Sequence, residues 1–267
     1  MNRQQTDKIK TWFDGYVAGF YGGDEYINAN IKLKDVHSRC VCGEMRYLAE
    51  ALALSEDQKA IALAIGLLHD VGRFEQFKKY RTYKDHESVN HCTLGVEVLR
   101  RSDVLGDLDA AERQIIEKAV EYHGLKELPP GLVDQTLLFA RMIRDADKID
   151  VFRVIGEYQK LYEQDRDNFL LEIELADEPR CSPEIIDAIM NERLIDYSRL
   201  QTLNDMRLMQ VGWVYDINFA ATLERIEQRK NIQMLLGCLP QTEEMRRIEE
   251  KIITYVDSRL RGSNKTR

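Results

Sequence analysis

Several features are absent or scarce in this sequence of 267 residues, and each shortage excludes a class of protein. No run of about 18 apolar residues and no apolar N-terminal signal segment occurs, so neither membrane spanning nor export is expected. The five cysteines are odd in number and scattered, which fits reduced thiols better than a disulfide framework. We therefore predict a cytoplasmic protein that does not enter a membrane.

Basic residues are also in deficit, because 38 Lys and Arg face 46 Asp and Glu and leave a formal net charge of −8. A dedicated nucleic-acid or anionic-membrane binder would show a basic excess, so neither is expected, although a small anionic substrate can still bind where basic residues cluster. No stretch rich in Pro, Gly or Ser divides the chain, and no alternating strand pattern or internal repeat occurs. The sequence thus predicts one all-α domain over residues 1–267.

The most informative stretch is an apolar run from Ile61 to Leu68 that ends in the pair His69 and Asp70, with Gly72 after it. Its eight residues carry no charge and suit a helix buried on every side, which the glycine would close. An imidazole and a carboxylate at the end of a buried helix cost several kcal/mol if nothing pairs with them. A divalent metal ion would compensate both groups.

Three further histidines fall on the inward faces or ends of successive predicted helices. His37 begins a helix in which apolar residues recur every three or four positions, His91 lies in the first turn of another, and His123 ends a third. With His69, four of the five histidines thus point inward, which chance explains poorly. His86 is the exception, and we assign it a surface role or a role in supporting a ligand.

Imidazole and carboxylate ligands suit Zn²⁺, Mn²⁺, Fe²⁺, Co²⁺ or Ni²⁺, and the absence of a thiolate set argues against a structural zinc site. A later predicted helix, from about residue 133, carries both Asp145 and Asp147. Because this helix is apolar almost all round, periodicity does not say which aspartate faces the site. Glu44, two turns into the helix of His37, can orient a histidine or add a ligand.

The segment 73–84 reverses the acidic character of the chain, with five basic residues against one acid. It is either a solvated loop anchored by aromatic side chains or a clamp for a phosphate group beside the metal. For Lys148, an ion pair with Asp145 or Glu44 is an equal alternative to phosphate binding. The candidate substrate-binding residues are Arg73, Lys78, Lys79, Arg81 and Lys148.

At these positions the sequence resembles the HD-domain superfamily of metal-dependent phosphohydrolases, over about residues 35–160. The family pattern of a histidine, a His-Asp pair and a distant aspartate is matched by His37, by His69 with Asp70, and by an Ala-Asp-Lys run. In that run the matching aspartate is Asp147, with Asp145 as the alternative. The resemblance implies a helical HD-domain bundle over 35–160, flanked by N-terminal helices over 3–34 and C-terminal helices over 182–260.

The chain is also similar to the members that carry two further histidines and bind two metal ions, with the aspartate of the pair as the bridge. His91 with Gly95 matches the His-x-x-x-Gly helix start, and His123 matches the later histidine. Arg73 stands where members carry lysine, which keeps a phosphate-binding role. The Gly-Tyr-Pro signature of cyclic-dinucleotide phosphodiesterases is replaced by Gly-Leu-Lys-Glu-Leu-Pro at 124–129, so that substrate is not assigned.

The resemblance implies an enzyme that hydrolyses a phosphate ester of a nucleotide or another small phosphorylated metabolite, using hydroxide activated by one or two divalent transition-metal ions. Asp70 and Arg73 would be its catalytic residues, and a homo-oligomer is possible. Two alternatives stay open: a di-iron oxygenase similar to the myo-inositol oxygenase group, and a regulatory module without catalysis. The implied metal ligands are His37, His69, Asp70, His91, His123 and Asp147.

Overall fold

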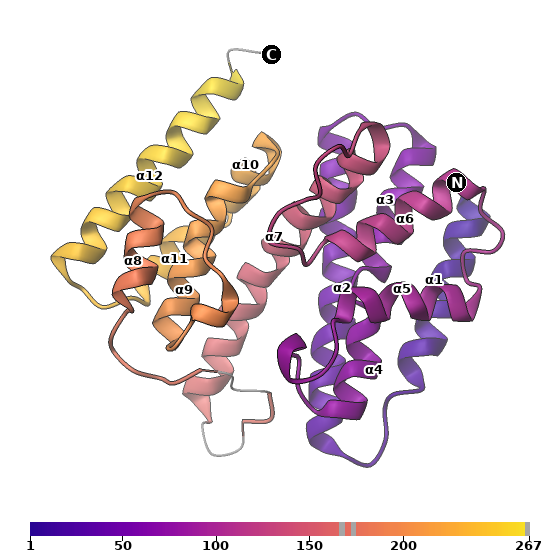
Figure 1. Cartoon of the computed structure of the whole chain (residues 1–267), viewed down its shortest axis with the longest axis horizontal. Helices are drawn as coiled ribbons and strands as arrows, with labels where there is room; N and C mark the ends of the chain where they lie inside the picture. Colours follow the sequence, from indigo (N-terminus) through magenta and orange to yellow (C-terminus); the bar gives the residue numbers. More distant parts are fainter. Residues whose placement is uncertain (166–168, 172–174, 265–267) are drawn as a thin grey trace. The chain divides into compact units, whose positions relative to one another are not determined.

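The computed structural model describes residues 1–165, 169–171 and 175–264, and its regular structure is helical, which confirms the predicted fold class (Figure 1). Among these residues, β-type pairing is limited to an isolated bridge between Ala176 and Thr202. The chain forms two compact units. The first comprises Met1–Val151 and the described part of 161–172, and the second comprises Phe152–Lys160 and the described part of 173–267. The expectation of one domain over the whole chain stays a prediction.

The first unit holds the helices that carry the inward-facing histidines. Ser55 and Gln58 form the predicted capping box, and Asn90 and Asp109 each accept a backbone N–H at the start of the following helix. The Asn90 cap makes His91 the first residue of its helix. The elements are α1 (Arg3–Ala18), α2 (Glu25–Ala51), α3 (Glu56–Leu68), α4 (Val71–Tyr80), η1 (Asp85–Glu87), α5 (His91–Ser102), α6 (Ala110–Tyr122) and the first part of α7 (Asp134–Gln164).

Three local predictions were wrong. His37 lies in the middle of α2 and does not begin a helix, because no proline interrupts residues 25–51. Gly72 does not close α3, which ends at Leu68, but lies in the first turn of α4. Most of the basic segment 73–84 is the helix α4, so the loop alternative for this segment is wrong; Phe74 and Phe77 are buried, whereas Tyr80 is exposed.

Two close helix crossings set the positions of the helices that carry the histidines. Gly66 of α3 faces the backbone of α2, where an added Cβ would lie 2.7 Å from Cys42 Cα. Gly72 of α4 faces the start of α5, where a Cβ would overlap the carbonyl oxygen of His91 and lie 2.7 Å from the amide nitrogen of Gly95. Since glycine has no side chain, the backbones can approach closely at both places. The crossings bring α3 to α2 and α4 to α5.

Large apolar side chains fill the first unit and hold its helices in place. Phe13 of α1 meets Phe74 of α4 edge to face, with ring centroids 5.8 Å apart. Burying a side chain of this kind contributes about 1.5–3 kcal/mol, so the packing that fixes the ligand-bearing helices is strong. Other fully buried residues of this core are Ile31, Met45, Leu48, Ile65, Leu68, Phe77, Leu99 and Phe139.

The second unit contains the C-terminal helices that the sequence predicts over 182–260. Its polar anchor is the Asp205 carboxylate, which accepts the backbone N–H and the hydroxyl of Ser182 at 2.6 Å and 2.7 Å and the N–H of Thr202 at 3.1 Å. No described helix of the chain is both long and apolar enough to cross a bilayer. The elements are α8 (Pro183–Met190), η2 (Tyr197–Arg199), α9 (Leu203–Gly212), η3 (Trp213–Asp216), α10 (Ala220–Gln228), α11 (Asn231–Gly237) and α12 (Glu243–Asn264), with the second part of α7.

Replacing Gly66 with alanine is expected to lower the free energy of unfolding by about 1–3 kcal/mol, because the new Cβ overpacks the crossing of α2 and α3. Gly43 is the matched control, since it lies in α2 with nothing within 4 Å of an added Cβ. Gly43→Ala should stabilise the protein by up to about 1 kcal/mol through helix propensity. Urea unfolding followed by circular dichroism measures both variants. Equal free energies for the two would show that the crossing tolerates a side chain.

Candidate metal centre

Imidazole and carboxylate groups from separate elements of the first unit meet at one buried point. The helices α2, α5 and α7 each bring one residue, the junction of α3 and α4 brings the His-Asp pair, and the end of α6 brings one histidine. The four histidines and the aspartate of the pair are at most 7% exposed. The residues that meet are the six predicted ligands, His37, His69, Asp70, His91, His123 and Asp147.

Four of these residues, His37, His69, Asp70 and Asp147, form what we name the first ligand group. The Nε2 atoms of His37 and His69 are 3.2 Å apart. His37 Nε2 lies 3.1 Å from Asp147 Oδ1 and 3.6 Å from Asp70 Oδ2, and His69 Nε2 lies 3.8 Å and 3.7 Å from the same two oxygens. Ligand atoms about 2.1 Å from one ion lie about 3.0–3.4 Å apart, so small adjustments let these four atoms hold a metal ion.

The second ligand group consists of His91, His123 and the other oxygen of Asp70. The two Nε2 atoms are again 3.2 Å apart, and they lie 3.7 Å and 3.5 Å from Asp70 Oδ1. Asp70 therefore directs Oδ2 toward the first group and Oδ1 toward the second. This is the arrangement that a carboxylate needs in order to bridge two metal ions.

Two of the imidazoles are oriented by carboxylates on their other nitrogen. His37 Nδ1 lies 2.7 Å from Asp150 Oδ2, and His91 Nδ1 lies 2.7 Å from Asp85 Oδ2. A carboxylate in this position fixes the ring and makes the opposite nitrogen a better metal ligand. Neither aspartate is among the predicted ligands, and each supports one ligand group.

The other two imidazoles are oriented by backbone carbonyl oxygens. Nδ1 of His69 donates to the Gly66 oxygen at 2.9 Å, and Nδ1 of His123 donates to the Val120 oxygen at 2.8 Å. An acceptor on Nδ1 favours the tautomer with its proton there, which leaves the Nε2 lone pair toward the centre. Two buried Nε2 atoms 3.2 Å apart can share a proton or bind one cation, and these nitrogens with the carboxylate oxygens beside them form a donor set that fits a divalent metal.

Neighbouring acidic groups raise the pKa values of two of the histidines. Burial lowers the pKa of His37, but hydrogen bonds to two aspartates outweigh burial and raise it above the usual value. The pKa of His123 is raised well above its usual value despite burial, because Cys92 and Asp70 lie beside it. Burial dominates at His69 and lowers its pKa to about 4, so this ring is neutral at neutral pH.

The pKa values of two carboxylates of the site are lowered. Burial raises the pKa of Asp70, yet the charge of Lys34 beside it holds the pKa well below its usual range. Burial also raises the pKa of Asp85, but its hydrogen bond with His91 helps to lower the value to about 2. The centre thus keeps negative charge on Asp70 and Asp85 at neutral pH, which is the electrostatic setting of a cation site.

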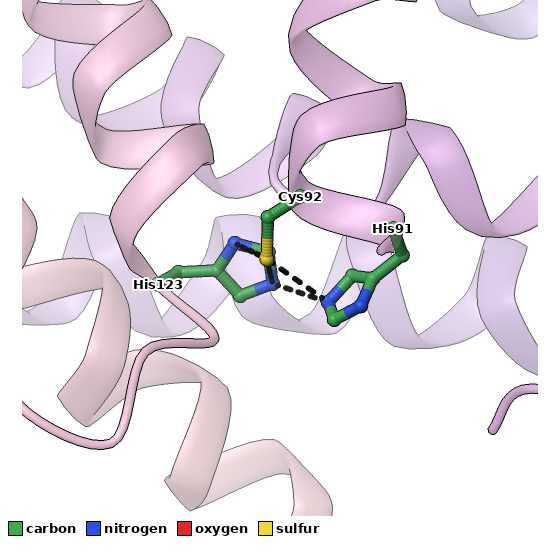
Figure 2. A group of neighbouring side chains, drawn as sticks. All are labelled: His91, Cys92 and His123. Atoms are coloured by element: carbon green, nitrogen blue, oxygen red, sulfur yellow. Dashed lines mark hydrogen bonds between the residues drawn. The ribbon is translucent and has the colours of Figure 1, made fainter. Parts of the chain in front are cut away.

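Cys92 lies close enough to His91 and His123 for the three to hold a metal ion together, but the position of its sulfur relative to His123 argues against the thiol as a ligand. Its Sγ lies 3.3 Å from His91 Nε2, and 3.6 Å and 4.0 Å from Nδ1 and Nε2 of His123 (Figure 2). A sulfur bound to the same ion as His123 Nε2 would lie nearer to Nε2 than to Nδ1, whereas here it lies nearer to Nδ1. Burial raises the pKa of the Cys92 thiol, but His123 and His91 outweigh it and lower the pKa to about 5.

Of the two candidate aspartates of α7, Asp147 lies beside the imidazoles. Its side chain is 27% exposed, and Asp145, two residues earlier and so about 200° away around the helix, is fully buried. This geometry favours Asp147 as the ligand. Lys148 is buried on the same helix, and Glu44 is buried on α2 two turns after His37.

Arg73 reaches the site but is occupied by protein acceptors. Its Nη1 donates to Asp85 Oδ1 at 2.9 Å, to the Tyr83 carbonyl oxygen at 2.6 Å and to Gln76 Oε1 at 2.8 Å. Its buried Nε lies 3.7 Å from Asp70 Oδ1 and has no hydrogen-bond acceptor among the described residues. Arg73 therefore holds the carboxylate that orients His91 and places positive charge beside the shared aspartate.

The remaining basic residues predicted to bind substrate from this segment lie at the exposed end of α4. Lys78 donates to a backbone carbonyl oxygen in the loop between α1 and α2, and Arg81 forms an ion pair with Asp24 at 2.5 Å. Lys79 is exposed as well. Their positions give no support to a substrate contact at the centre. His86 is 62% exposed in its side chain, in keeping with a surface role.

Sequence reasoning does not find three neighbours of the ligands, Lys34, Asp85 and Asp150. Lys34 Nζ donates to Asp70 Oδ2 at 2.9 Å. Its place one turn before His37 in the same helix is a signal that could have identified it. No local pattern marks the two aspartates, since Asp150 lies 113 residues from the ring that it orients.

A separate cavity of about 680 Å³ lies between α1, α2 and α3. Its walls include Ile9, Leu63 and Leu67, and charged side chains stand around them. None of the six predicted metal ligands lines it. This cavity is therefore separate from the buried cluster of predicted ligands.

The comparisons with known proteins agree with this geometry. Residues 35–151 match the HD domain, a segment that contains all six predicted ligands. This segment is an HD domain. HD domains bind divalent metals and are mostly phosphohydrolases, so the match supports a metal-dependent phosphohydrolase in general.

One relative of this HD-domain protein is the 3'3'-cGAMP-specific phosphodiesterase 1 of Vibrio cholerae serotype O1 (strain ATCC 39315 / El Tor Inaba N16961). The two are 26% identical over 151 residues, which is 54% of this chain and 34% of the relative. The chain thus spans about a third of the length of the relative that it matches. No solved structure matches this chain.

Asp85→Ala is expected to weaken metal binding by about 10–100-fold, because the carboxylate that orients His91 is lost. Glu87→Ala is the matched control, since Glu87 lies in the same short helix η1 and pairs with Lys84 instead of a ligand. Calorimetric titration of the metal-free proteins with Mn²⁺ measures both. Equal affinities of the two variants would contradict the supporting role of Asp85.

Metal binding is expected to release protons, since the pKa values of His37 and His123 are raised in the metal-free protein and only a neutral imidazole binds a metal. Apparent metal affinity should therefore rise with pH until the pH exceeds both pKa values. Calorimetric titration in buffers of different ionisation enthalpy counts the released protons. A binding heat that does not depend on the buffer would rule out this coupling.

Proposed function

We propose that this protein is a metal-dependent phosphohydrolase that cleaves a phosphate ester of a nucleotide or another small phosphorylated metabolite. The observation that carries the proposal is the position of Asp70, whose two oxygens each face a pair of imidazole Nε2 atoms. The HD-domain match supports the reaction class, and the relative's name supports a phosphodiester of a nucleotide as one substrate to test.

The first ligand group would hold one divalent ion and the second group another, with Asp70 shared between them. A divalent ion held there supplies a hydroxide nucleophile near neutral pH, because it lowers the pKa of a bound water from about 15.7 toward about 7. The carboxylates Asp85 and Asp150 keep the imidazoles in the tautomer that binds metal. Asp70 fixes the spacing of the two positions through its rigid carboxylate.

The exposure of the side chains indicates where a substrate approaches. Asp147, Lys34 and Arg73 are 27%, 19% and 15% exposed in their side chains, whereas the four histidines are at most 8% exposed. Solvent therefore reaches these three residues more readily than the imidazoles. A phosphate group that approaches them would find the positive charges of Lys34 and Arg73 beside Asp70.

Asp70→Ala is expected to abolish metal retention and phosphate-ester hydrolysis together, because both ligand groups lose their shared oxygen donor. Helix content should stay close to that of the unchanged protein. Metal analysis after anaerobic purification, circular dichroism, and a screen of nucleotide monoesters and diesters that includes 3'3'-cGAMP measure the three quantities. Metal content equal to that of the unchanged protein would contradict the ligand assignment.

The aspartates of α7 provide a matched pair for the same assays. Asp147→Asn should lower metal content in the first ligand group, whereas Asp145→Asn should leave it in place. Purified protein that retained iron, required dioxygen and released no phosphate would replace the hydrolase proposal with the oxygenase alternative. Retained metal without activity on any phosphate ester would favour the regulatory alternative.

A further inference from the structure

Lys34 is the cation that lies closest to the shared carboxylate. It precedes His37 by one turn of α2, and its Nζ donates to Asp70 Oδ2 at 2.9 Å. That oxygen is the one that faces the first ligand group. Positive charge is thus fixed beside the first ligand group.

The surroundings of Lys34 hold its ammonium group in place without using all of its hydrogen-bond donors. Nζ lies 5.2 Å from the centroid of the Tyr83 ring, a cation–π distance, and the Tyr83 hydroxyl donates to the Asn30 carbonyl oxygen at 2.8 Å. Within the described part of the chain, Asp70 is the acceptor that Nζ contacts. An ammonium has three donors, so two of them are left for water or a ligand. A side-chain exposure of 19% lets a ligand reach them.

The basic residues of the segment 73–84 are less suited to contact a substrate. Arg73 donates from Nη1 to three protein acceptors, and its Nε, which has no acceptor among the described residues, is buried. Lys78 and Arg81 contact groups at the far end of α4. Lys34 combines direct contact with Asp70, free donors and access to solvent. When metal ions neutralise the charge of Asp70, the ammonium becomes available to an anion.

We propose that Lys34 binds a phosphoryl oxygen of the substrate at the metal centre, in the role that the sequence suggests for the basic residues 78–81. The inference rests on the proposed function. Binding there would hold the phosphoryl group beside the first ligand group and place positive charge where negative charge develops on the phosphoryl oxygens during hydrolysis. Lys34 thereby acts on substrate binding and turnover and not on metal retention.

Lys34→Gln tests the inference, with Lys32→Gln as the matched control, since Lys32 is an exposed lysine on the same helix. In Mn²⁺-loaded protein, Lys34→Gln should weaken the binding of inorganic phosphate at least tenfold and lower kcat/KM at least tenfold. Its affinity for Mn²⁺ should stay equal or increase, because a positive charge next to the ions is removed. Lys34→Arg should restore part of the phosphate affinity, and Lys32→Gln should behave as the unchanged protein.

Calorimetry with inorganic phosphate separates the inference from the proposed function, since it requires no turnover. Phosphate affinity unchanged in Lys34→Gln would overturn the inference and leave the phosphohydrolase standing. Loss of Mn²⁺ affinity in Lys34→Gln would also overturn it, since Lys34 would then support the ligands. Weaker phosphate binding in Lys34→Gln, together with no hydrolysis of any ester by the unchanged protein, would uphold the phosphate contact and refute the proposed function.

Discussion

The structure depends on one buried carboxylate that is shared between two pairs of imidazoles. Asp70 is 3% exposed, and an ionised carboxylate at that depth is unfavourable unless positive charge surrounds it. Lys34 and Arg73 provide part of that charge, and a metal ion in each ligand group would provide the rest. Burying this carboxylate costs free energy, and the same carboxylate fixes the distance between the two ligand groups. Asp70 therefore affects both the stability of the fold and the geometry of the candidate metal site.

The close helix crossings explain how ligands from separate helices reach the same carboxylate. Gly66 lets α3 lie against the backbone of α2, which brings His69 beside His37, and the contact of Gly72 with Gly95 brings His91 beside Asp70. A side chain at either glycine would push apart helices whose ligand atoms must lie within a few tenths of an ångström of their positions. Burial of the apolar core stabilises the fold and thereby keeps the helices this close together.

Charged groups of both signs lie around the centre at partial exposure. Asp150, which orients His37, is buried, whereas the side chains of Asp85 and Asp147 are 32% and 27% exposed. Lys34 and Arg73, at 19% and 15% exposure, place positive charge beside Asp70. In an acidic protein this local positive charge favours a small anion at the centre without making the whole surface attractive to nucleic acid.

The sequence by itself determined the helical fold class and the residues that could form a metal site, because helical periodicity and caps are local and place His69, His91 and His123 at helix ends. It left open which aspartate of α7 faces the imidazoles, and it placed the basic residues of α4 nearer the site than they lie. Only the tertiary structure decided these points and revealed Lys34 and the supporting aspartates. The physical reason is that hydrogen bonds such as the one between His37 and Asp150, 113 residues apart, depend on how helices cross, which no local pattern encodes.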